Sequence, residues 1–146
     1  MHHDPIYLGH KSEPRHHEIE KGAIRRFAEA LGERDPIYFD EQTAIAEGYK
    51  GLPAPPTFAF TLNPSPIPGL ELPAAGIIHG EQEFTFGRTI CSGDIITVRA
   101  WVEDVKVRKG RLGSMTLFTI MREGVHQNGD NAFLARSLLI VTEGVE

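Results

Sequence analysis

A change in hydrophobic period near residue 77 constrains the fold of this chain more than any other feature. From this point apolar residues recur at every second position, most clearly at Ile96, Val98 and Ala100, and a period of two is that of a β-strand. Clusters of Gly, Ser, Asn and Asp at 92–94 and 124–130 interrupt the alternation, as turns do. The pattern therefore predicts a strand at about 78–90 and then an antiparallel meander of three long strands, at about 95–107, 115–121 and 133–141.

A helical period precedes the strands. Apolar residues within 19–31 are spaced i, i+3, i+4 and i+7, which places them on one face of a helix. Gly32 follows the last of them and is expected to end this helix, because glycine readily adopts the left-handed conformation found at helix C-termini. The apolar positions are Ile24, Phe27, Ala28 and Leu31.

A second, shorter helix follows a proline. Asp35 precedes Pro36 and is therefore expected to be extended. Asp40 is a favourable N-cap residue, and we predict that it begins a helix over Glu41–Glu47 that Gly48 closes.

Residues 56–62 predict a third helix, since proline suits the first helical position and the segment is apolar on nearly every side. We expect it to be buried. Residues 63–76 contain four prolines and two glycines and form a long loop, which is either functional or mobile, or an ordered cover over the sheet. Helices followed by a meander indicate an α+β fold, with a long antiparallel sheet wrapped around the helix at 56–62.

The chain of 146 residues is expected to form one domain, residues 1–146, with a polar N-terminal arm over 1–17. The arm holds five of the seven histidines, and the adjacent pair at 16–17 suggests a metal site. Metal ligands need convergent partners at defined spacing, and none follow, so we expect a solvated arm and no metal. The five are His2, His3, His10, His16 and His17.

Composition argues against several classes of partner. The net charge is −5 and basic runs are absent, which disfavours nucleic acid and anionic membranes. No apolar run approaches the roughly 20 residues of a membrane span, and the N-terminus lacks the apolar core of a signal peptide. Cys91 is the single cysteine, which fits a reducing compartment. We expect a cytoplasmic protein without a cofactor, in which Cys91 is a buried, unreactive thiol.

Four stretches of the sequence carry a resemblance to a known family. They are Ala28–Asp40, Gly48–Phe60, His79–Phe84 and Cys91–Asp94. The layout resembles the hot-dog fold, and the residues resemble the MaoC-like (R)-specific hydratase/dehydratase family from about residue 18 to 141. Within it, the chain is most similar to the N-terminal MaoC dehydratase branch, which includes HadA-type subunits and the first half of peroxisomal hydratase 2.

Catalytic members of the family carry an Asp-x-Asn-Pro-x-His motif and a glycine at the start of the central helix. The resemblance implies that the Asp and His activate water and exchange a proton at the α-carbon of an acyl thioester, while the glycine N–H binds the thioester oxygen. With Pro36 placed on the motif proline, Glu33 replaces the Asp and Tyr38 replaces the His. Counting onward, Pro56 replaces the glycine. An ordinary phenol titrates near ~10, and proline has no N–H to donate.

The candidate catalytic residues are therefore Glu33 and Tyr38 at the motif positions, and His79 as a substitute imidazole near Glu81 or Glu33. His79 is alternatively a structural residue or a ligand contact. His126 falls in a predicted turn and is expected to be solvated. The candidate substrate-binding residues are Pro56, Thr57, Phe58, Glu81 and Gln82.

Family members without the catalytic pair are substrate-binding halves of two-part enzymes. The resemblance therefore implies a catalytically incomplete subunit of a heteromeric (R)-3-hydroxyacyl-thioester dehydratase, with acyl-CoA or acyl-carrier protein as ligand and a homodimeric or heterodimeric assembly. Whether this chain is itself an enzyme stays open. The alternatives are an autonomous enoyl hydratase that uses a relocated acid and base, a hot-dog thioesterase, and a binding module without any catalytic partner.

Overall fold

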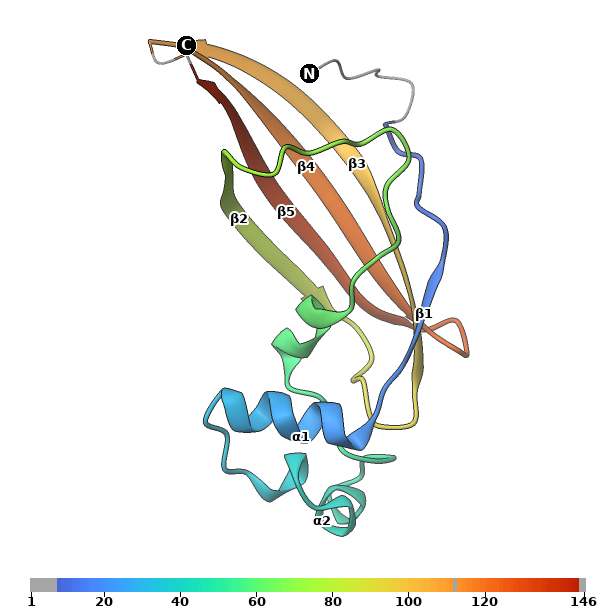
Figure 1. Cartoon of the computed structure of the whole chain (residues 1–146). Coiled ribbons are helices and arrows are strands. Elements are labelled where there is room, and N and C mark those ends of the chain that lie inside the picture. Colours follow the sequence, from blue (N-terminus) through green and yellow to red (C-terminus); the bar gives the residue numbers. More distant parts are fainter. Residues whose placement is uncertain (1–7, 112, 145–146) are drawn as a thin grey trace.

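The predicted meander is the main body of the structure, a computed structural model that describes residues 8–111 and 113–144. Three long strands follow one another in the order β3, β4 and β5, and two further strands lie at the edges, so that the antiparallel sheet has the order β1-β3-β4-β5-β2 (Figure 1). The strands are β1 Arg15–Glu18, β2 Ile77–Phe86, β3 Ile95–Gly110, β4 Gly113–His126 and β5 Asn131–Gly144.

The alternation in β3 determines which face of the sheet is covered. Ile96, Val98, Ala100 and Val102 are all buried, and residues directly opposite one another on paired strands point to the same side. We call this side the inner face. The helices gather at one end of it, and the segment 63–76 crosses it towards β2 (Figure 1).

The helices begin and end largely where the sequence predicts. Helix α1 spans Lys21–Ala30 and buries Ile24 and Ala28, and Gly32 follows it with φ of 76°. Helix α2 spans Glu41–Ala46, and its N-cap carboxylate, on Asp40, accepts a hydrogen bond from the backbone N–H of Thr43 at 3.2 Å. A short 3-10 helix, η2, covers Pro36–Tyr38 between them.

Two sequence predictions about the sheet were wrong. Part of the predicted polar arm, Arg15–Glu18, is an edge strand paired with β3; four polar residues are too few to show alternation. The predicted turn at 124–130 is shorter, because β4 continues to His126. Gly124 lies inside that strand. Glycine is needed there because any side chain would overlap the ring of Phe133, and not because the chain turns. Residues 1–7 of the arm lie outside the described residues.

The third helix is a 3-10 helix, η3, over Pro56–Thr61. It buries Phe58 and Ala59, but the side chain of Phe60 is 47% exposed. The prediction of burial on nearly all sides was therefore wrong for this chain alone, because the sheet covers only one side of η3.

Two hydrophobic clusters lie along the inner face. The first joins α1, α2 and η3 to one end of the sheet, around Leu52 and Phe133. The second is smaller and centres on Val102 and Phe118, with Ile67 and Leu70 of the segment 63–76 packed against it. This segment is thus an ordered cover, one of the two alternatives that the sequence left open.

Candidate functional site

Glu33 lies just beyond α1 and has an exposed side chain. Its backbone N–H donates to the carbonyl of Ala28 at 3.0 Å, which closes the end of the helix. The side chain forms no hydrogen bond or ion pair with any described residue. The carboxylate at the first motif position is therefore held by the backbone alone.

Tyr38 ends η2, and its side chain is half-buried. Burial raises the pKa of its phenol, and the neighbouring Glu33 and Asp35 carboxylates raise that pKa further. The phenol is therefore neutral near pH 7. It can donate or accept a hydrogen bond, but it cannot take up a proton as a general base in the way the motif histidine would. Asp35 is occupied locally, since its Oδ1 accepts from the N–H of Ile37 at 3.1 Å.

Pro56 opens η3 at the position of the motif glycine and offers no N–H. Two residues further on, the backbone N–H of Phe58 donates to the carbonyl of Pro55 at 2.9 Å. A cavity of about 90 Å³ lies beside Pro56, between η3 and the end of β2, with Ala59, Phe86 and Arg88 among its walls. Of the predicted binding residues here, Thr57 is exposed and Phe58 is buried against Phe27.

His79 lies on β2 and joins a polar network on the inner face. The oxygen Oε1 of Gln82 accepts from the hydroxyl of Ser137 at 2.6 Å and lies 3.0 Å from Nε2 of His79. Because an amide oxygen only accepts, Nε2 carries the proton in this arrangement, which leaves Nδ1 of a neutral ring as an acceptor. The ring of His79 also stacks against Phe60, with 6.3 Å between the centroids.

Glu81 does not join this network. The sheet register shifts between His79 and Glu81, and Glu81 instead pairs with Arg136 at 3.0 Å. The expected pairing of His79 with Glu81 or Glu33 is therefore not made, and Gln82 holds the imidazole. The sequence did not identify Ser137; the signal was a polar residue within an apolar strand, opposite Gln82.

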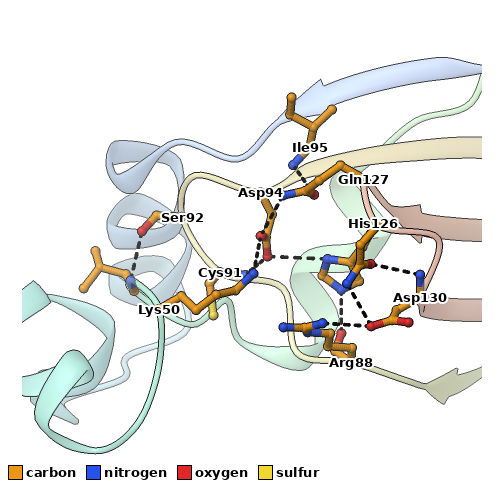
Figure 2. Close-up of polar contacts among 11 residues, drawn as sticks. Lys50, Arg88, Cys91, Ser92, Asp94, Ile95, His126, Gln127 and Asp130 are labelled. Atoms are coloured by element: carbon orange, nitrogen blue, oxygen red, sulfur yellow. Dashed lines mark hydrogen bonds and ion pairs between the residues drawn. The ribbon is translucent and has the colours of Figure 1, made fainter.

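A second polar cluster lies where the turn before β3 meets the turn after β4 (Figure 2). Asp94 is 3% exposed and His126 is 4% exposed, with 3.5 Å between Oδ2 and Nδ1. Nε2 of His126 lies 2.9 Å from the carbonyl oxygen of Arg88. The prediction that His126 is solvated was wrong, because β4 extends through it and turns its ring to the inner face.

Cys91 belongs to the same cluster and is buried, as expected. Its backbone N–H donates to Oδ2 of Asp94 at 2.8 Å. Burial raises the pKa of its thiol, and the Asp94 carboxylate raises it further, so the thiol is a poor nucleophile. This cluster holds two turns together.

Two wider features bear on the site. Within residues 8–111 and 113–144, His, Cys, Asp and Glu side chains form no group of three that could hold a metal ion. The helices in the same residues are too short and too polar to cross a bilayer.

Known proteins share both the sequence and the fold. Residues 7–134 match the family described as FAS1-like, dehydratase domain region. A UPF0336 protein of Saccharopolyspora erythraea is 33% identical over 144 residues, which cover 94% of this chain and 90% of that protein.

Solved structures agree with the sequence relatives. The MaoC-like dehydratase of Rhodospirillum rubrum is 26% identical with a TM-score of 0.70, covering 95% of this chain and 94% of that one. The HadBC (3R-hydroxyacyl-ACP dehydratase) complex of Mycobacterium tuberculosis has a TM-score of 0.71 at 21% identity, with 92% and 96% covered, and shows the fold alone. The long antiparallel sheet with its few helices is accordingly a hot-dog fold, and the chain belongs to the MaoC-like hydratase/dehydratase family.

Proposed function

We propose that this chain is the substrate-binding, catalytically incomplete subunit of a heteromeric (R)-3-hydroxyacyl-thioester dehydratase. The observation that carries the proposal is the state of Tyr38. A phenol is protonated near pH 7, and burial raises the pKa of Tyr38 further, so this residue at the motif histidine position cannot take a proton from the α-carbon or from water.

Pro56 and Glu33 support the same conclusion. Proline at the start of η3 removes the N–H that would stabilise an enolate oxygen. The Glu33 carboxylate forms no hydrogen bond within residues 8–111 and 113–144 that would orient it towards a substrate. A catalytic partner with an intact motif would supply the missing groups, and the related HadBC dehydratase is itself a complex of two proteins.

The test is hydration of crotonyl-CoA by the purified chain, alone and mixed with a MaoC-like partner recovered with it. We expect turnover only in the mixture, with acyl-CoA or acyl-carrier protein bound by both. Robust turnover by the chain alone would contradict the proposal. Release of free thiol from acyl-CoA would instead indicate a thioesterase.

One observation favours an autonomous hydratase as a second candidate. Nε2 of His79 faces Oε1 of Gln82, which the hydroxyl of Ser137 also holds, so Nδ1 is the ring nitrogen that would act as a general base when the ring is neutral. If the chain alone is active, His79→Ala should abolish turnover. His16→Ala is the matched control, because His16 is an exposed histidine bonded only to Thr97.

A further inference from the structure

A cavity of about 480 Å³ lies between the segment 63–76 and the inner face of the sheet. Its volume is within the range of small-molecule sites, about 300–1,000 Å³. Most of its walls are apolar, from Pro64, Pro66, Ile67, Leu70, Leu72, Ala100 and Ile120; Ser65 adds a hydroxyl, and Arg15 and Arg122 add two guanidinium groups. We call it the loop cavity.

Arg122 is a charged residue on the covered side of the central strand. It pairs with Ala100 on β3 and with Ala135 on β5, and both alanines are buried, so it belongs to the inner face. The small side chains on either side leave space for the guanidinium. Burial lowers the pKa of Arg122, although a guanidinium stays charged at neutral pH.

Arg122 has no carboxylate partner among the described residues. Nη1 donates to the carbonyl oxygens of Phe60 at 3.2 Å and Leu62 at 3.5 Å, and the guanidinium carbon lies 5.7 Å from the centroid of the Phe60 ring. These contacts use one of the three nitrogens. A half-buried cation without a counter-ion is unfavourable, so the remaining N–H groups favour an anionic ligand.

Arg15 adds a second positive charge to the same cavity. It pairs with Val98, a buried residue of the inner face, and its side chain forms no ion pair with the described part of the chain. No carboxylate lines the cavity among the described residues: neither Glu13, close to Arg15 in sequence, nor Glu71 of the segment 63–76 is part of its wall. The loop cavity thus combines an apolar wall with two cations that form no ion pair with any carboxylate of the described residues.

We propose that the loop cavity binds the carboxylate end of an aliphatic chain, with Arg122 and Arg15 holding the carboxylate and the prolines and leucines of segment 63–76 covering the methylene groups. Such a carboxylate has two sources. It is either the head group of a free fatty acid or the distal carboxylate of an acyl group whose other end is a thioester. The second source rests on the proposed function, and the first does not.

The first arm of the test compares decanoate with neutral decanamide by isothermal titration calorimetry. We expect decanoate to bind at least about tenfold more tightly, the value of a charge-assisted hydrogen bond. Arg122→Gln and Arg15→Gln should each reduce decanoate affinity about tenfold and leave decanamide unchanged. Arg15→Gln is informative even if Arg122→Gln fails to fold, because Arg15 is exposed on an edge strand.

Arg99→Gln is the matched control. Arg99 lies beside Ala100 on β3, on the opposite face of the sheet, and is exposed, so its loss changes net charge equally without touching the cavity. Equal affinity for decanoate and decanamide, or equal effects of Arg99→Gln and the two cavity variants, would overturn the proposal. No binding of decanoate by the folded wild-type chain would overturn it as well.

The second arm identifies the source by comparing decanoyl-CoA with the CoA monothioester of decanedioic acid. A preference for the dicarboxylic thioester that Arg15→Gln or Arg122→Gln removes supports a distal acyl carboxylate. Arginine-dependent binding of decanoate without binding of either thioester supports a free fatty acid and contradicts the proposed function. Equal, arginine-independent binding of both thioesters leaves the proposed function intact and overturns the loop cavity assignment.

Discussion

Replacement of Asp94 by alanine should destabilise the fold more than its position in a turn suggests. The carboxylate is buried and accepts from the N–H of Cys91 at 2.8 Å. It also lies 3.5 Å from Nδ1 of His126 and 3.4 Å from Nζ of Lys50. Asp94→Ala therefore leaves a buried N–H and a buried imidazole facing a void (Figure 2).

The magnitude follows from the groups left without a partner. One unsatisfied buried N–H costs about 1–3 kcal/mol, and the buried imidazole of His126, which loses the carboxylate beside it, costs about as much again. The two terms overlap because they share one carboxylate, so we expect the free energy of unfolding to fall by about 3 kcal/mol. Asp94→Asn keeps an acceptor for Cys91 and should cost about 1 kcal/mol.

Urea unfolding followed by circular dichroism measures these changes, provided that the slope of the transition stays constant. Asp130→Ala is the control, since Asp130 pairs with Arg88 on the surface and should contribute far less. A double-mutant cycle with His126→Ala should give a coupling of about 1 kcal/mol or more. A loss below about 0.5 kcal/mol for Asp94→Ala, or strict additivity with His126→Ala, would refute this account.

Three further predictions concern other residues. Gly124→Ala should lower the free energy of unfolding by about 2 kcal/mol or more, because the new methyl group overlaps the buried ring of Phe133. Gly110→Ala should change it little in the same assay, because a methyl group there meets only the carbonyl oxygen of Gly113, at 4.0 Å. Cys91 should react with a chromogenic thiol reagent near pH 8 far more slowly in the native chain than in denaturant, because burial raises its thiol pKa. The raised pKa also means that the thiol stabilises the fold at pH values below its unfolded pKa of about 8.5. This contribution to the free energy of unfolding should be lost as the pH rises. Ultraviolet titration should show a tyrosine that ionises above the ordinary range and that Tyr38→Phe removes, because burial and nearby carboxylates raise its pKa; that contribution to stability should likewise be lost only as pH rises through the folded-state value.

The fold was predictable where a residue type has one local use. Asp40 caps α2 and Gly32 ends α1, as their chemistry requires. The alternation of β3 determined both its strand and its buried face. The prediction was wrong where the same residue type serves long-range packing. Gly124 is needed because the ring of Phe133 lies against its backbone, and nothing in the neighbouring sequence distinguishes it from a turn glycine.

The candidate site was predictable only in part, because register brings its residues together. Sequence reasoning named His79 and Gln82, but the expected partners were neighbouring carboxylates. Pairing of β2 with β5 instead places Ser137 opposite Gln82. A bulge beside His79 directs Glu81 towards Arg136. One inserted residue changes the face on which every later side chain lies, and no local pattern records it.

The same reasoning explains why Arg122 escaped notice and why its position is informative. In the sequence Arg122 stands beside Glu123, and two adjacent charged residues are typical of a solvent-exposed strand. In the sheet it lies on the covered face, in a row with Ala100, Ala135 and Phe84, between the two hydrophobic clusters. An apolar residue there could have merged the clusters into one core, at a gain of about 25 cal/mol per Å² of buried apolar surface. A cation in that row forgoes this gain, and binding of an anion is the role that its unpaired N–H groups support.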